Sequence, residues 1–169
     1  MKYLLLLLLL SPLSFANEQL INGFGYYYKV PEHAAINDST QFKIAFDVAD
    51  GAKKGEQNNA MNSLARFINM HVAHGIKPEN IKLALVVHGG ASVDVLSNDE
   101  YKKRFNVDNK NASLINQLLA NNTQVFVCGQ SATHFKVTPK QLIQGVTMSL
   151  SAMTAHAQLQ QQGYTLNPF

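Results

Sequence analysis

The chain contains one cysteine, Cys128, at a position that favours a reactive thiol. It follows the β-branched, apolar run 123–127 and precedes Gly129 and the residues Gln130 and Ser131, where a helix is expected to start. A thiol acts as a nucleophile only as the thiolate, and the N–H groups at a helix N-terminus lower the thiol pKa. The sequence therefore predicts a nucleophile at a strand end, with a buried structural cysteine as the alternative.

Other candidate site residues follow the ends of expected strands. His88 comes directly after the apolar run 81–87, and Asp50 comes shortly after the run 42–48. In a parallel sheet the carboxyl ends of the strands share one edge, so we expect His88 and Cys128 in one crevice. There His88 would tune the thiol or handle protons. The residues expected to bind the substrate are Gly129, Gln130, Ser131, Asp50 and His134.

The elements that position these residues alternate along the chain. Apolar residues at helical spacing predict amphipathic helices, and short apolar runs bounded by turn residues predict strands. The expected strands are 42–48, 81–87, 123–128, 146–150 and 164–166, and the main helices are 57–74, 111–120 and 151–162. Strands that alternate with helices favour an α/β domain, in which a parallel sheet has helices on both sides.

The first residues have the pattern of a secretory signal peptide. Lys2 precedes the unbroken apolar run 4–10, and a small-x-small cleavage site follows at 14–16. The apolar run is too short for a membrane span, which takes about 20 residues. We therefore expect a signal peptide at 1–16, export to the periplasm, an irregular N-terminal arm at 17–40 and a single domain at 41–169.

Composition excludes several classes of protein. The 169 residues carry a net charge of +3 with 15% charged residues, and the few basic pairs form no cluster that indicates nucleic-acid binding. The glycines after His88 lack the G-x-G-x-x-G spacing of a dinucleotide loop. His71 and His74 have helical spacing, but no carboxylate or thiol stands near them in the sequence. We expect no metal and no cofactor.

Several segments resemble a known family. They are 86–89, 101–105 with Asn109 and Asn111, 127–132, 149–152 and 162–164. Together they are similar to the exported branch of the DsrE/DsrF-like family over residues 42–169. The resemblance implies a three-layer α/β/α fold with a five-stranded, mainly parallel sheet, and homo-oligomers such as trimers or hexamers. In characterised members of the wider family a cysteine at this strand end carries sulfane sulfur as a persulfide, and Cys128 matches that position.

The leading hypothesis is a periplasmic sulfurtransferase or sulfur carrier that exchanges sulfur with a donor and an acceptor protein. One alternative is a non-catalytic oligomeric module that binds a small anion or a partner, with Cys128 as a buried structural residue. A further alternative is a metal or haem site that uses Cys128 with His88 or His134. It ranks last, because only two plausible ligands converge and the chain has no C-x-x-C-H motif.

Overall fold

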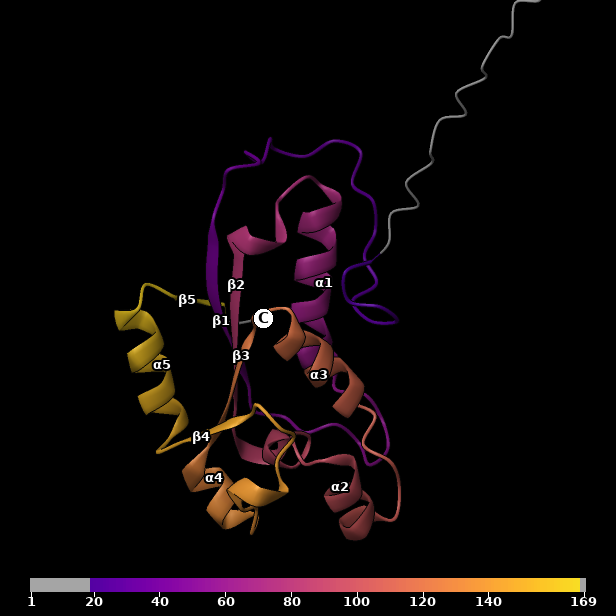
Figure 1. The fold of residues 1–169 in the computed structure, drawn as a ribbon, viewed down its shortest axis with the longest axis vertical. Helices are drawn as coiled ribbons and strands as arrows, with labels where there is room; N and C mark the ends of the chain where they lie inside the picture. Colours follow the sequence, from indigo (N-terminus) through magenta and orange to yellow (C-terminus); the bar gives the residue numbers. More distant parts are fainter. Residues whose placement is uncertain (1–18, 168–169) are drawn as a thin grey trace, which may run out of the picture.

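Five parallel strands form one sheet in the order β4-β3-β2-β1-β5. The computed structural model describes residues 19–167, and Figure 1 shows helices on both sides of the sheet. The strands are β1 Phe42–Val48, β2 Ile81–Val87, β3 Gln124–Cys128, β4 Thr147–Ser149 and β5 Thr165–Asn167. The helices are α1 Asn59–Ala73, α2 Asn98–Phe105, α3 Ala112–Ala120, α4 Gly129–His134 and α5 Ala152–Gln161, with 3₁₀ turns η1 Pro78–Asn80, η2 Gly89–Val93 and η3 Pro139–Gln141.

The three-layer α/β/α fold predicted from the sequence is confirmed, and every pairing in the sheet is parallel. β2 lies in the centre, and six of its seven residues are buried. Such a continuous apolar run is typical of a strand with both faces covered. The predicted fourth strand, 146–150, is shorter in the structure because only Thr147–Ser149 pair with β3.

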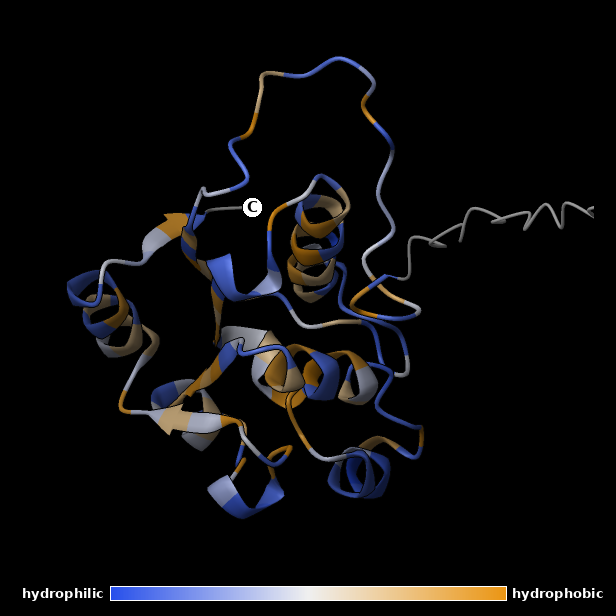
Figure 2. Ribbon diagram, turned by 45° about the horizontal axis from the view of Figure 1, so that its top comes forward, coloured by the Kyte–Doolittle hydropathy of each residue, from blue (hydrophilic) through white to orange (hydrophobic). Residues whose placement is uncertain are grey.

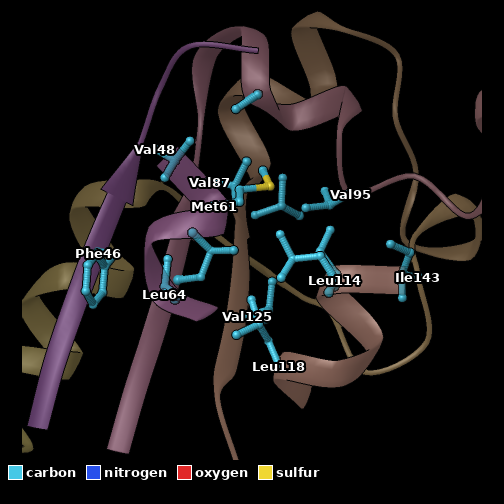
Figure 3. Packing of buried hydrophobic residues seen from close by; sticks show 14 of the residues in the cluster. Phe46, Val48, Met61, Leu64, Val87, Val95, Leu114, Leu118, Val125 and Ile143 are labelled. Atoms are coloured by element: carbon cyan, nitrogen blue, oxygen red, sulfur yellow. The ribbon is translucent and has the colours of Figure 1, made fainter. Parts of the chain in front are cut away.

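The two faces of the sheet are covered unequally. α1 and α3 cover one face and α5 covers the other (Figure 1). On the first face, side chains such as Leu64 of α1 and Leu114 of α3 pack against Val125 in a large apolar core (Figure 3). On the second face the core is small, and consists of Ala45, Ala84, Val86, Ala155, Leu159 and Tyr164. Figure 2 shows hydrophobic residues concentrated in the strands and the inner sides of the helices.

Local sequence signals set the ends of the helices. The side chain of Asn58 caps α1 by accepting hydrogen bonds from the N–H groups of Ala60 and Met61. Gly75 follows the last turn with a φ of +89°, which a glycine adopts without strain. Ser151 caps α5 and accepts from the N–H of Thr154 at 3.0 Å. This last cap fixes where α5 begins.

The described part of the N-terminal arm, residues 19–40, contains no helix or strand. Its first residues are fixed to α1 by the buried side chain of Asn69, which accepts from the N–H of Ile21 at 2.8 Å and donates to its carbonyl at 3.0 Å. Tyr26 and Tyr28 are exposed. The predicted signal peptide, 1–16, lies outside the described residues. Within residues 19–167, every helix is too short or too polar to cross a membrane.

Candidate functional site at the carboxyl edge of the sheet

Strand register brings three reactive side chains to one face of the sheet. Val86 of β2 pairs with Asp47 of β1 on one side and with Phe126 of β3 on the other. Side chains alternate along a strand, so His88 and Cys128, two residues further on, lie on the same face as Val86 and Phe126. That face is the one that α5 covers. Asp47, His88 and Cys128 therefore meet beneath the N-terminal half of α5.

Cys128 has a free thiol, and the residue is only 5% exposed. Burial would raise its pKa, but hydrogen bonds to the sulfur outweigh this effect and the pKa is lowered. The donors are the backbone N–H groups of Ser131, Ala152 and Gln130 and the hydroxyl of Ser131. The thiol thus lies where the first turns of α4 and α5 converge, and the thiolate is the form that this arrangement favours.

Gly129 allows the two helix starts to come together. A Cβ atom at this position would lie 2.6 Å from the carbonyl oxygen of Ser149 and 3.2 Å from that of Leu150. The Gln130 side chain also donates to the Leu150 carbonyl at 3.4 Å. This close approach holds the β4–α5 connection against α4, and so brings the N–H of Ala152 to the sulfur of Cys128.

Asp47 joins two histidines at the same edge. Its Oδ2 lies 3.0 Å from Nε2 of His88, and its Oδ1 lies 2.6 Å from Nε2 of His156 in α5. Because a carboxylate only accepts, each Nε2 is the donor, which assigns the tautomer of both rings. Burial would raise the pKa of Asp47, but the hydrogen bonds from His88 and His156 outweigh it and lower the pKa. The carboxylate is therefore charged beside the thiol.

These groups open into a cavity of about 420 Å³, here called the thiol cavity. Its polar part contains the thiol, the carboxylate and the two imidazoles. Its rim is apolar, with Met153 80% exposed and Leu166 49% exposed. The full lining is Asp47, His88, Cys128, Gln130, Ser151, Ala152, Met153, His156 and Leu166. The cavity offers an acidic thiol and two groups that can exchange protons, behind an apolar entrance.

A second cavity, of about 280 Å³, lies between the N-terminal arm and α1 and is lined by His33, His71 and His74 among apolar residues. Nδ1 of His71 lies 2.7 Å from the carbonyl of Phe67, and Nδ1 of His74 lies 2.6 Å from that of Met70. Burial lowers the pKa of His71. Over residues 19–167, no three His, Cys, Asp or Glu side chains are arranged to hold a metal ion. This cavity has neither a thiol nor a carboxylate.

The structure gathers most of the residues that the sequence singled out. Cys128, His88 and Gln130 line the thiol cavity. Ser131 donates to the sulfur and its hydroxyl accepts from the N–H of Gly89 at 3.0 Å, which ties α4 to the residue after His88.

Two predicted site residues lie elsewhere. Asp50 is exposed, and its backbone carbonyl accepts from the side-chain amide of Asn58 at 2.9 Å. His134 is exposed at the end of α4, where its ring contacts that of Phe135. Neither lines the thiol cavity.

Sequence reasoning missed Asp47, His156 and Ala152. Asp47 had a signal, because it is the one acidic residue within the apolar strand 42–48 and alternation places it on the face of Ala45, beneath α5. His156 had none, since its partner is 109 residues away. The N–H of Ala152 could be placed at the sulfur only with the three-dimensional contact between Gly129 and Ser149.

The fold and the site define a class of α/β/α proteins with one thiol at the carboxyl edge of a parallel sheet. Within this class, the model of the DsrE/DsrF-like family matches residues 43–168, and the chain belongs to that family. The resemblance noted in the sequence is thereby confirmed. The family is linked to sulfur relay.

Two solved structures have the same fold. One is the protein of unknown function MTH1491 from Methanobacterium thermoautotrophicum, at 13% identity, and the other is the ychN protein from E. coli, at 20% identity. Each comparison has a TM-score of 0.54 and covers 76% of this chain and 100% of the other. No curated protein matches the chain. At these identities the likeness concerns the fold alone.

Proposed function

We propose that this protein carries sulfane sulfur as a persulfide on Cys128. The observation that carries the proposal is the set of donors around the sulfur, from Gln130, Ser131 and Ala152, which lower the thiol pKa in a buried position. A buried thiol without such donors would be neutral and inert. The link of the DsrE/DsrF-like family to sulfur relay supports the same chemistry.

The transfer step is a thiol–persulfide exchange. The Cys128 thiolate attacks the outer sulfur of a donor R–S–SH, a new S–S bond forms, and the old S–S bond breaks with its electron pair on R–S⁻. The proton that left Cys128 goes to His88 and from there to the leaving R–S⁻. The product on the protein is Cys–S–SH, and attack on its outer sulfur by an acceptor thiolate returns Cys128 to the start. The exchange is redox-neutral, so no external oxidant or reductant is required.

The setting proposed for this chemistry is the periplasm, from the signal-peptide pattern at 1–16. The proposed partners are a sulfur donor, an acceptor protein and further copies of this chain in a trimer or hexamer. The apolar residues Leu150, Met153 and Leu166 support a macromolecular contact, since they are exposed beside the thiol cavity. Large exposed apolar side chains in one area are typical of contact surfaces.

The 5% exposure of Cys128 favours a second candidate, a non-catalytic module in which the cavity binds a small anion or a partner and the thiol is structural. The two candidates differ in the reactivity of Cys128. A structural thiol is alkylated slowly in the native state and rapidly after denaturation, whereas a carrier thiol reacts in the native state.

The test is mass spectrometry of the intact, reduced protein after incubation with polysulfide, and separately with thiosulfate. We expect one added sulfur atom that dithiothreitol removes, and no addition to the Cys128→Ser variant. The matched control is His134→Gln, which changes a histidine of α4 outside the thiol cavity and should load as the wild type does. Failure of the wild type to gain sulfur, while its native thiol reacts with iodoacetamide, would refute the carrier function.

A further inference from the structure

A carboxylate at the position of Asp47 is expected to destabilise the fold unless it is compensated. Asp47 lies within the apolar strand β1, between Phe46 and Val48, which are each 2% exposed. A carboxylate taken partly out of water is destabilising unless hydrogen bonds or opposite charge compensate it. Here each oxygen accepts from one imidazole, at 3.0 Å from His88 and 2.6 Å from His156. The compensation comes entirely from groups that also line the thiol cavity.

The hydrogen bonds determine which ring atoms remain for chemistry. Nε2 of His88 and Nε2 of His156 are both engaged with Asp47 as donors. In a neutral imidazole the other nitrogen has a lone pair, so Nδ1 of each ring is the atom that can take a proton. Both rings line the cavity that contains Cys128. Two proton acceptors are thus held at one carboxylate beside one thiol.

Asp47 and the two imidazoles that donate to it form one small group of charges. With both rings neutral, Asp47 and the two histidines sum to one negative charge, and a single proton brings the sum to zero. A second proton would place two imidazolium ions beside one carboxylate.

Among residues 19–167, the elements packed around Asp47 contribute no other charged group to the cavity. His88 comes from the end of β2, His156 from α5 and Cys128 from the end of β3. β5 contributes the uncharged residue Leu166. Lys43, on the same strand as Asp47, instead contacts the Tyr164 ring and the Gln162 carbonyl. The titratable groups that the described residues bring to the cavity are therefore one thiol, one carboxylate and two imidazoles.

We propose that Asp47 is the positioning residue of this site, and that it holds His156 as a second proton acceptor alongside His88. The inference rests on the proposed function for its role in sulfur transfer. In the exchange step one imidazole takes the Cys128 proton and becomes an imidazolium ion, which Asp47 neutralises. The same ion stabilises the neighbouring thiolate until the proton passes to the leaving R–S⁻. Asp47 acts through the histidines and does not touch the reacting sulfur.

The test is the rate of Cys128 alkylation by iodoacetamide between pH 5 and pH 9 in the full folded chain, which needs no sulfur donor. We expect the wild-type thiol to stay reactive below neutral pH, because an imidazolium ion held by Asp47 would stabilise the thiolate. We expect Asp47→Asn to lower the rate at pH 6 about tenfold, the factor that one pH unit of thiolate titration represents. Asp47→Glu restores a carboxylate and is expected to recover part of the rate.

His156→Gln separates proton uptake from positioning. Gln retains an N–H donor for Asp47 but has no basic nitrogen that can take a proton. The alkylation rate of His156→Gln at pH 6 should therefore fall, as it does in Asp47→Asn. It also keeps the proposal testable if Asp47→Asn fails to fold. The matched control is Asp50→Asn, which removes an exposed carboxylate outside the cavity and should leave the profile unchanged.

The outcomes separate this inference from the proposed function. Alkylation rates at pH 6 that fall in both Asp47→Asn and His156→Gln support the inference, whether or not the wild type gains sulfur from polysulfide. Profiles of the two variants that coincide with the wild-type profile overturn it, even where the wild type does load sulfur on Cys128.

Discussion

Two aspartates near the carboxyl edge of the sheet have opposite environments. Asp94, at the end of η2, is completely buried, and its Oδ2 accepts from the N–H of Ala52 at 2.9 Å and the side-chain amide of Asn58 at 2.8 Å. Burial raises the pKa of Asp94 despite these hydrogen bonds. Asp47 is about one-third exposed and accepts from His88 and His156, and its pKa is lowered. Neutral amide donors do not offset the burial of Asp94, whereas two imidazoles do offset that of Asp47.

The difference in environment indicates different roles for the two carboxyl groups. Asp94 belongs to a buried polar network in which Asn109 donates to its carbonyl at 2.9 Å and Asn111 accepts from the N–H of Asn58 at 2.7 Å. This network joins the loops after β1 and β2 to the start of α3. Asp47 instead carries a charge into the thiol cavity. Pairs of acids with pKa values displaced in opposite directions are a guide to the functional one.

The largest expected effect is on stability. Asp94→Ala leaves the N–H of Ala52 and the Asn58 amide without their acceptor, and should reduce the free energy of unfolding by about 2–4 kcal/mol. Asp47→Ala, which removes an acceptor that is about one-third exposed, should reduce it by less than about 1 kcal/mol. Urea unfolding at pH 7 measures both. Equal reductions in the free energy of unfolding of the two variants would contradict the difference between Asp94 and Asp47.

The second prediction concerns the pH dependence of stability, which should have opposite signs for the two acids. The folded pKa of Asp94 lies above its ordinary value of 3.8, so its contribution is present below that value and is lost as the pH rises through the folded pKa. The folded pKa of Asp47 lies below 3.8, so its contribution is present above 3.8 and is lost as the pH falls through the folded pKa.

Denaturant melts of the Asn variants across pH 2–8 measure these contributions. Relative to the wild type, Asp94→Asn should gain stability as the pH rises above about 4. Asp47→Asn should gain relative stability as the pH falls below about 4, since the wild type then loses its ion pairs. Difference curves with the same slope for both variants would contradict the contrast between the two carboxyl groups.

The smallest expected effect extends the comparison to the thiol, which resembles Asp47 because polar partners also lower its pKa. Ser131→Ala removes one donor to the sulfur and the acceptor of the Gly89 N–H. We expect a loss of about 1 kcal/mol in stability and a rise in the pH midpoint of Cys128 alkylation. Thr133→Ala, on the exposed side of the same helix, is the control and should change neither.

Much of the fold could be predicted because its signals are local. Apolar runs such as 81–87 and helical spacing in 57–74 reflect burial along one element, and Gly75 and Ser151 mark helix ends in the sequence itself. The same reasoning placed Cys128 and His88 at neighbouring strand ends. These patterns predict five strands with helices on both sides of the sheet, and the family resemblance implies the same three-layer arrangement.

The rest of the site depends on contacts between distant segments. His156 is on a helix with several similar turns, and nothing in the sequence indicates which turn lies over Asp47. The sequence favours Asp50 because it follows the strand, whereas the carboxylate that lines the cavity lies inside the strand at Asp47. A side chain that breaks the hydrophobicity of a buried strand was the better signal.

The wide separation of these segments has a consequence for folding. Cys128 obtains its donors from α4 and α5, and α5 and β5 are the last elements of the described chain. Because β5 pairs with β1, the edge of the sheet is complete only when both ends of the domain have come together. In the unfolded chain the thiol has ordinary acidity and lacks neighbours that activate it. The lowered pKa of Cys128 is therefore a property of the native state alone, because its donors come together only when both α4 and α5 are in place.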